Sequence, residues 1–407
     1  MLAAIERMTG VKWRGQGPAF LVGFGHAATH WIIGTFYVLL PYIAETLELS
    51  YAQTGGLVTV FHASAFIANV GSGAIVDIGG RRALVQGVSL VIGGGALMAV
   101  GLADSALLLA SLVVLIGITN NLWHPAAISF LSRRYPGNRG YALALHTLGA
   151  SLGDMVAPVV AGAAMVGLAS WQGAISASAI PVFIIATLIL IFLTRTEKAE
   201  RSSAEPTLGG RDYLAGLGRL VRDRAVVGLC VMAGFRSMTQ NGLLVFLPLL
   251  MVNELGFGPV IVGVALMSMQ MGGMIAGPLA GTLSDRVGRQ PVVFIFLTAA
   301  TVVVAGLTFV EGATLFIGVL VILGFVLFAV RPVIHSWVMD LTPDEMSGSA
   351  ISLLFGTQSG LSTVVPFAGG VIADIWGLES VFYMLAGTMV VANLIVYFLP
   401  DSRRSDG

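Results

Sequence analysis

Long apolar runs separated by short polar segments dominate the chain. Twelve runs have the length of about 20 residues that crosses a hydrocarbon core as a helix. They lie near 19–44, 52–76, 83–102, 106–131, 140–166, 172–194, 226–252, 259–283, 290–310, 313–338, 347–372 and 377–399. Backbone groups in lipid must be paired within their own segment, and the alternating pattern of a membrane barrel is absent. The pattern therefore predicts an all-α membrane protein with twelve transmembrane helices.

A polar motif occurs twice at matching places between these runs. The segment 73–82 (GAIVDIGGRR) ends one apolar run and opens the next, and 281–290 (GTLSDRVGRQ) repeats it 208 residues later (281 − 73). A repeat over half the chain indicates two pseudo-symmetric bundles of six helices. We expect an N-terminal half at 1–194, a cytoplasmic linker rich in charge, Ser and Gly at 195–224, and a C-terminal half at 225–407.

The composition agrees with a membrane protein and excludes a soluble one. Of 407 residues, 56% are hydrophobic and 10% are charged, and the mean hydropathy is +0.91, which is far from a soluble domain. A single cysteine, Cys230, allows no intrachain disulfide. The polar start and the long first run predict no cleavable signal peptide. No nucleotide-binding loop of the GxxxxGKS type occurs, so ATP-driven transport has no support and no cofactor is expected.

Basic residues fall on alternate loops. Nineteen of the 21 lysines and arginines lie in the two termini and in the segments 81–82, 133–139, 195–224 and 286–289, whereas the opposite loops have none. The positive-inside rule then places both termini in the cytoplasm. We expect a multi-pass protein of a bacterial-type inner (cytoplasmic) membrane.

The repeated motif, the two six-helix halves and the long linker together resemble the major facilitator superfamily over the whole chain. The resemblance implies a transporter, not an enzyme, with helices one, four, seven and ten around a central cleft. It also implies that the loop motif takes part in conformational change, because an aspartate at one helix end can pair with an arginine at the next. The residues are Gly73, Asp77, Arg81, Asp285 and Arg289. Simple anchoring of the cytoplasmic face by the arginines is the alternative.

Glycine and proline recur in the fifth predicted helix and again in the eleventh. The first set is Gly149, Gly153, Pro158 and Gly162, and the second is Gly356, Gly360, Pro366 and Gly370. The first set resembles the antiporter motif of the superfamily, although Ala157 and Ala161 stand where glycines are usual, and this resemblance implies export. A generic seam of small residues for helix packing is the alternative.

Other residues resemble the fosmidomycin-resistance branch of drug efflux transporters. They are Gly25-His26, Leu40-Pro41, His124-Pro125, Phe246-Leu247-Pro248 and Phe398-Leu399-Pro400-Asp401. That branch usually has acids at two positions where this chain has His30 and Ala126. The roles of those acids are therefore not carried over.

Ionisable residues within the predicted spans mark the candidate site, because an unpaired charge in hydrocarbon costs about 2.5 to 3.5 kcal/mol or more. Asp154 is the only carboxylate near the middle of a span. We predict that Asp154 carries a coupled proton, with His30 and His26 as further candidates. A static ion pair between Asp154 and a buried arginine is the alternative.

Arginines and histidines in the cleft-lining helices favour an anionic substrate, because a guanidinium matches carboxylate or phosphate groups. The predicted substrate-binding residues are Arg236, Arg331, His124, His335, Trp123, Asn120 and Gln240. Structural hydrogen bonds are expected for His62 and His146. The histidines are also the nearest approach to a metal site, but their spread over several helices does not favour one, and no metal is predicted.

These observations predict a proton-coupled secondary transporter, an antiporter that exports a small organic anion or drug, such as a phosphonate or carboxylate, by alternating access. A proton symporter that imports a similar anion is one alternative. A lipid-handling or signalling protein on the same fold is another. The expected partners are a small anionic substrate, protons and membrane lipid, without nucleic acid, and a monomer is expected.

Overall fold

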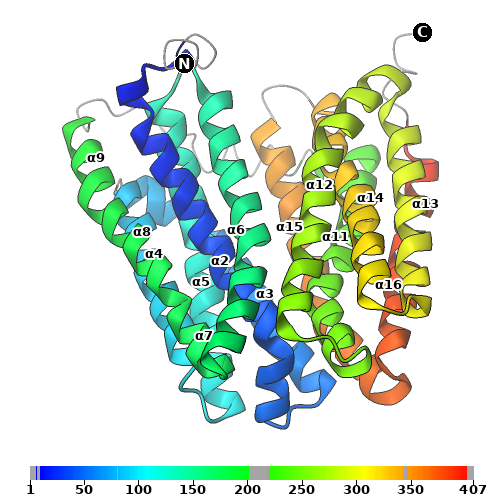
Figure 1. Ribbon diagram of the computed structural model, residues 1–407. Helices are drawn as coiled ribbons and strands as arrows, with labels where there is room; N and C mark the ends of the chain where they lie inside the picture. Colours follow the sequence, from blue (N-terminus) through cyan, green and yellow to red (C-terminus); the bar gives the residue numbers. More distant parts are fainter. Residues whose placement is uncertain are drawn as a thin grey trace. The chain divides into compact units, whose positions relative to one another are not determined.

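The computed structural model describes residues 6, 10–79, 81–200, 218, 220–342 and 347–400, without the side chains of 14, 69–79, 199–200 and 347–349. Every element in these ranges is a helix or a helical turn, and no strand occurs in them (Figure 1). The predicted all-α class is confirmed.

The first half of the chain contains five unbroken long helices and a composite sixth. The long helices are α2 (Gly17–Thr46), α3 (Tyr51–Gly79), α4 (Arg82–Val100), α5 (Ala106–Arg134) and α6 (Arg139–Leu168), preceded by the short turn η1 (Trp13–Gly15). The sixth is built from α7 (Trp171–Ala177), α8 (Ala179–Leu188), the π-helical turn η2 (Ile189–Leu193) and α9 (Thr194–Glu200).

The second half repeats the arrangement. Its helices are α11 (Arg224–Leu249) with the π-helical turn η3 (Leu250–Glu254), α12 (Pro259–Val287), α13 (Arg289–Gly306) with the turn η4 (Leu307–Phe309), α14 (Ala313–Asp340), α15 (Ser347–Trp376) and α16 (Leu378–Phe398). Eleven helical segments among the described residues are long and apolar enough to cross a membrane, and α3, with 29 residues, is a further long helix. Each of the twelve predicted segments is helical.

Helix ends are fixed by local chemistry. The Asp223 carboxylate accepts hydrogen bonds from the backbone N–H groups of Ala225 and Val226 at 2.8 and 3.2 Å, and so caps the start of α11. Between α12 and α13, Gly288 has a φ of 105° that strains any residue with a side chain. This glycine allows a tight turn in which it is the one residue between the end of α12 and the start of α13.

Tyr135, at the end of α5, forms hydrogen bonds to the start of α2, the end of that helix that the sequence predicts to be cytoplasmic. The Tyr135 hydroxyl donates to the backbone oxygen of Gly15 at 2.7 Å and accepts from the N–H of Ala19 at 3.2 Å. Burial raises the pKa of Tyr135 from its ordinary value of 10.0. The neutral phenol that this favours is the form that can donate to Gly15.

The chain divides into two compact units, one of residues 1–43 with 63–206 and the other of 44–62 with 207–407. The predicted bounds of the halves and of the linker 195–224 remain a prediction, since most of that linker lies outside the described residues. In both units large apolar side chains stay exposed, among them Leu107 at 80% and Phe309 at 78%. Such exposure suits helices surrounded by lipid.

Candidate functional site

Two helices of the first unit, α2 and α6, approach so closely that their backbones touch. A Cβ atom at Gly149 would lie 2.0 Å from the backbone oxygen of Gly23, and one at Gly153 would lie 2.4 Å from that of Ala27. No side chain fits at either position. Membrane helices gain packing energy from such contacts between small residues, and here the contact also decides which neighbouring side chains can meet.

One consequence of this contact is an ion pair between His30 on α2 and Asp154 on α6. The position of a Cβ at Gly153 is only 2.8 Å from the Cβ of His30, so the next residue, Asp154, comes within reach of the imidazole. The Nδ1 of His30 lies 2.8 Å from the Oδ1 of Asp154, and the two side chains are 26% and 30% exposed. The pair is therefore neither fully buried nor fully open to its surroundings.

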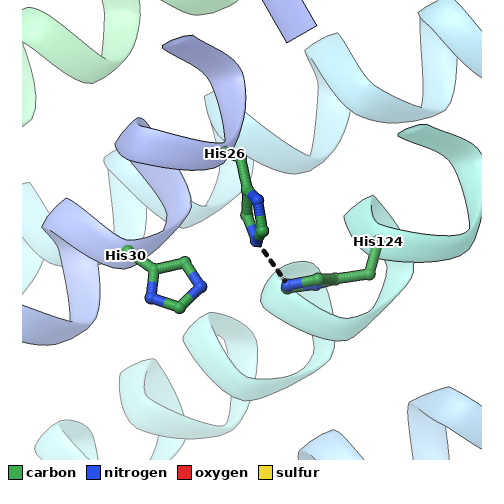
Figure 2. A group of neighbouring side chains, drawn as sticks. All are labelled: His26, His30 and His124. Carbon is green, nitrogen blue, oxygen red and sulfur yellow. Dashed lines mark hydrogen bonds between the residues drawn. The ribbon is translucent and has the colours of Figure 1, made fainter. Parts of the chain in front are cut away.

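A second contact joins His26, one turn earlier on α2, to His124 on α5. Their Nε2 atoms are 3.1 Å apart. The Nδ1 of His26 is 2.6 Å from the backbone oxygen of His146, and the Nδ1 of His124 is 2.7 Å from that of Asn120. Figure 2 shows the rings of His26 and His124 meeting at their tips, with the His30 ring beside them.

These hydrogen bonds determine which ring nitrogen of His26 and His124 carries a hydrogen. A carbonyl oxygen only accepts, so each Nδ1 must carry a hydrogen. In the neutral imidazoles both Nε2 atoms would then present lone pairs to each other at 3.1 Å. A proton or another cation between the two nitrogens removes this repulsion. The His26–His124 pair is therefore a cation-binding arrangement.

Aromatic rings pack against His26. The ring of His146 on α6 lies 3.8 Å from the His26 ring, centroid to centroid, at an angle of 32°. Trp123 stacks on both, with its ring centroid 5.2 Å from that of His26 and 5.6 Å from that of His146. Trp123 is fully buried. A Cβ at Gly25 would lie 2.8 Å from the Trp123 ring, so the glycine next to His26 makes room for the tryptophan.

His146 belongs to this cluster, although the sequence suggested only a structural role for it. Its Nε2 is buried and has no hydrogen-bond partner among the described residues, so the expected side-chain hydrogen bond does not account for this atom. One signal could have indicated its place: His146 and Asp154 are eight residues apart on one helix, a spacing that helical stripes include.

The second unit brings together three predicted residues. Arg236 on α11 is 3% exposed, and its Nη2 donates to the backbone oxygen of Leu327 at 2.7 Å. Its charge interacts with that of Arg331, and both act on His335, one turn after Arg331 on α14. Gln240, one turn after Arg236, is half-buried.

Arg236 is incompletely satisfied within the described residues. Its Nε has no hydrogen-bond partner there, and no described carboxylate forms an ion pair with it. The guanidinium also lies near the ring of Phe328, whose centroid is 6.0 Å from the guanidinium carbon. A buried cation without an anion is costly, so this guanidinium favours a negatively charged partner.

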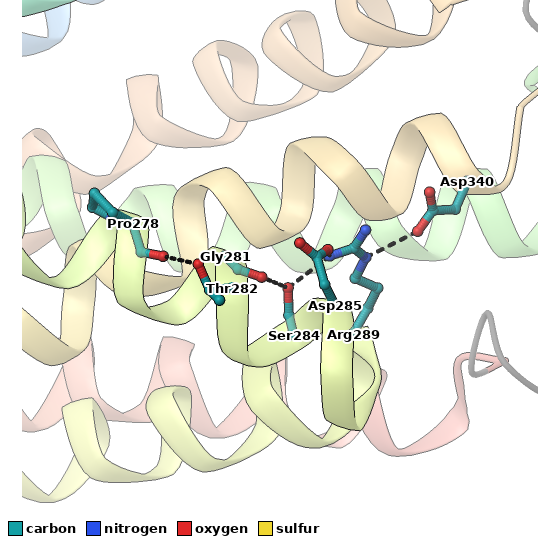
Figure 3. Close-up of polar contacts among 7 residues, drawn as sticks. All are labelled: Pro278, Gly281, Thr282, Ser284, Asp285, Arg289 and Asp340. Atoms are coloured by element: carbon teal, nitrogen blue, oxygen red, sulfur yellow. Dashed lines mark hydrogen bonds and ion pairs between the residues drawn. The ribbon is translucent and has the colours of Figure 1, made fainter.

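The loop motif forms a polar network at the α12–α13 turn. Arg289 donates from Nη1 to the Ser284 hydroxyl at 2.7 Å and to the Asp285 carboxylate, and from Nε to Asp340 at the end of α14 at 2.9 Å (Figure 3). In the first copy Arg81 is exposed. Gly73 and Asp77 belong to the stretch 69–79, whose side chains the structure does not describe. The second copy thus joins an aspartate and an arginine across helix ends.

Two further positions of the antiporter-like motif continue the α2–α6 contact. A Cβ at Gly34 on α2 would lie 3.2 Å from Ala157 and 3.6 Å from the Pro158 ring. Gly162, one turn beyond Pro158, is buried. Gly149, Gly153 and Pro158 of α6 thus pack along α2 from Gly23 to Gly34.

Similarity to known proteins identifies the family of this chain. The model of the Major Facilitator Superfamily matches residues 19–365 and 229–407. The chain belongs to the Major Facilitator Superfamily. It is a multi-pass membrane transporter and not an enzyme, as the sequence predicted.

Curated relatives of this superfamily member are transporters. It is 31% identical to the multi-drug resistance efflux pump PmrA of Streptococcus pneumoniae over 37% of this chain, a match that spans only 38% of that pump. It is 32% identical to the multidrug resistance protein MdtG of Klebsiella pneumoniae over 31% of this chain and 30% of MdtG. A phosphoglycerate transporter protein of Salmonella typhimurium is 22% identical over 92% of this chain and 87% of the relative.

Solved structures show the same fold. A bacterial homologue of the human lysosomal transporter Spinster, in an inward-facing and occupied conformation, superposes with a TM-score of 0.80 at 16% identity, over 95% of this chain and 96% of that one. The nucleoside transporter NupG gives a TM-score of 0.74 at 13% identity, over 94% and 99%. The predicted major facilitator fold is therefore confirmed.

Proposed function

We propose that this transporter is a proton-coupled antiporter that exports a small organic anion or drug by alternating access. The observation that carries the proposal is the His–Asp cluster of the first unit. It combines the half-buried His30–Asp154 pair with two histidine nitrogens that need a cation between them.

Protonation would change this cluster in a defined way. When His30 is charged, its contact with Asp154 is an ion pair, and when Asp154 takes up a proton the attraction is lost. His26 is 4.7 Å from His30, centroid to centroid, so a charge on one ring disfavours a charge on the other. The cluster can thus hold a limited number of protons and release them together with a change of conformation.

Arg236 supports an anionic substrate. Its guanidinium is buried, has an unpartnered Nε and forms no ion pair among the described residues. A carboxylate or phosphonate would supply the missing charge through a forked hydrogen bond. Arg331 adds a second positive charge in electrostatic reach. The name of the Salmonella relative, a phosphoglycerate transporter protein, is in line with this substrate class.

Export is the preferred direction because α6 carries the antiporter-like glycines and because PmrA is named an efflux pump. Proton symport, with import of a similar anion, is the second candidate. It is favoured by the extent of the match to the phosphoglycerate transporter, which spans most of both chains. Cytoplasmic termini and a monomeric transporter complete the proposal.

The decisive experiment measures anion flux in proteoliposomes under an imposed pH gradient. A panel of phosphonates and small carboxylates is offered inside or outside, and pH is recorded alongside. An antiporter should move the anion against the direction of proton flow, whereas a symporter should move it along with the protons. Flux that ignores the gradient would contradict proton coupling altogether.

Two variants assign the roles of the two sites. Asp154→Asn should retain anion exchange without a gradient and lose pH-driven movement, whereas Asp104→Asn, which alters a carboxylate in the segment between α4 and α5, should behave as the wild type. Arg236→Ala should abolish both activities at unchanged expression, with the exposed Arg222→Ala as its control. Retained pH-driven movement in Asp154→Asn would remove Asp154 from the proton site.

A further inference from the structure

We propose that His26, His30 and His124 form a binding site for a divalent transition-metal ion such as Zn²⁺, with an open fourth position. This site is additional to the transport activity proposed above. It concerns the same cluster but a different ligand, because a metal ion binds three nitrogen lone pairs where a proton binds one or is shared by two.

The three imidazoles share one kind of hydrogen bond at Nδ1. The Nδ1 of each has an oxygen as partner: the backbone oxygen of His146 for His26, that of Asn120 for His124, and the carboxylate of Asp154 for His30. An oxygen acceptor at one ring nitrogen fixes the tautomer and leaves the other nitrogen as a ligand. Histidines that bind metals in proteins almost always have such a partner, a carboxylate or a backbone carbonyl.

The Nε2 atoms are directed toward one another. Figure 2 shows that the nitrogen of His30 on the side of the His26–His124 pair is the one far from the attachment of the ring, hence Nε2. One nitrogen from each of the three histidines lies within 4.8 Å of the others. The three side chains come from two helices, α2 and α5, and are held by a third, α6, through Asp154 and His146.

The distances suit a tetrahedral ion. Bonds of about 2.0 to 2.1 Å from zinc to nitrogen place two ligands of a tetrahedron roughly 3.3 Å apart. The Nε2 atoms of His26 and His124 are already 3.1 Å apart. The other separations are no more than 4.8 Å, so reaching this value needs a movement of at most about 1.5 Å. His30, which is 26% exposed, has the freedom to make it.

The chemistry of the site selects the kind of ion. Three imidazole nitrogens suit zinc, cobalt, nickel or copper, whereas calcium and magnesium require oxygen ligands. Asp154 is occupied by the Nδ1 of His30 and acts as its orienting partner. With three protein ligands, the fourth position is open to water or to an exchangeable anion, an arrangement distinct from closed structural zinc sites.

Cobalt binding tests this site directly in the full-length protein, purified in detergent, freed of any oligohistidine tag and treated with chelator. Tetrahedral Co²⁺ absorbs visible light far more strongly than hydrated Co²⁺. We expect one Co²⁺ ion to bind per chain with this strong absorption and to be displaced by Zn²⁺. Absent or weak absorption would overturn the proposal and leave the pair with a shared proton only.

Variants connect the signal with the residues. His26→Gln and His124→Gln should lose the tetrahedral absorption, whereas His62→Gln, which alters a half-buried histidine outside the cluster, should keep it. Asp154→Asn should weaken affinity by about 10 to 100-fold, as the loss of an orienting carboxylate does. Equal binding in all of these variants would show adventitious association and overturn the proposal.

A gain of signal separates ligation from a structural role. His124→Cys should still bind Co²⁺ and should add the absorption of a thiolate ligand, which no merely structural histidine would produce. Cobalt absorption without the thiolate contribution would exclude His124 as a ligand. Transport assays are performed with chelator present and metal titrations without a pH gradient, so failure of either proposal is seen independently of the other.

Discussion

Replacing Gly153 with alanine should separate the two helices that carry the His30–Asp154 pair. The new Cβ would lie 2.4 Å from the backbone oxygen of Ala27, whereas ordinary contacts begin at 3.4 Å. The α2 and α6 backbones must therefore move apart by roughly 1 Å, the difference between these distances. Such a shift would lengthen the His30–Asp154 contact from 2.8 Å to about 3.8 Å, which is beyond hydrogen-bond range.

The energetic effect can be isolated with a control on the same helix. Overpacking a tight contact costs about 1 to 3 kcal/mol, while alanine in place of glycine gains up to about 1 kcal/mol of helix propensity. Gly167→Ala, also on α6, has the gain without the cost, because no atom lies within 4 Å of its new Cβ. The Gly153→Ala protein should therefore be less stable than the Gly167→Ala protein by about 1 to 3 kcal/mol.

Two measurements check this prediction. Thermal unfolding in detergent compares the stabilities, and pH-driven anion flux in proteoliposomes reports the ion pair. Gly153→Ala should unfold at a lower temperature and lose pH-driven flux, whereas Gly167→Ala should keep both. If the two proteins unfold and transport alike, the close contact of α2 and α6 does not position the His–Asp pair, and the reasoning fails.

Three further predictions concern helix ends. Asp223→Ala should cost about 0.5 to 2 kcal/mol in the free energy of unfolding, because it removes the cap of α11; an unchanged unfolding midpoint would contradict the cap. Because burial raises the pKa of Tyr135 above 10.0, its contribution to stability is complete below pH 10 and is lost as the pH rises through the folded-state pKa; Tyr135→Phe should cost about 1 kcal/mol and flatten the alkaline decline in a pH series of unfolding midpoints. Arg289→Ala should destabilise more than Asp340→Asn, since Arg289 also contacts Ser284 and Asp285, while Asp340 contributes one partly exposed ion pair worth under about 1 kcal/mol; equal unfolding midpoints would refute this ranking.

The positions of the helices follow from the sequence because lipid constrains them strongly. A span must be long, apolar and internally hydrogen-bonded, so the predicted 140–166 differs by one or two residues at its ends from the observed Arg139–Leu168. The division of the sixth span at Ser178 has a signal in the sequence, because Pro181 has no N–H to donate to the carbonyl of Ala177, four residues earlier. The π-helical turn at Ile189–Leu193 lies in an apolar stretch, so no polar signal marks it.

The site was predictable only in part. Spacing places His26 and His30 one turn apart, but it cannot show that His26 faces His124 or that Asp154 meets a histidine. Those contacts depend on how α2, α5 and α6 rotate against each other. In a membrane protein both the lipid-facing and the buried side of a helix are apolar, so periodicity does not define the rotation. For the same reason the sequence predicts only a structural role for His146.

Packing and chemistry use the same residues at the α2–α6 contact. Helices in lipid lack the hydrophobic effect as a driving force and rely on the close approach of small residues. At Gly153 that approach also sets the distance from Asp154 to His30, and at Gly25 a close contact of α2 with α5 sets the place of Trp123 against His26. A change of conformation that rotates or slides α6 along α2 must therefore alter the hydrogen-bond partner of His30 Nδ1. Because that partner determines whether the His30 Nε2 is available as a base or a ligand, helix movement and cation affinity are linked at this contact, which is the coupling that an antiporter needs.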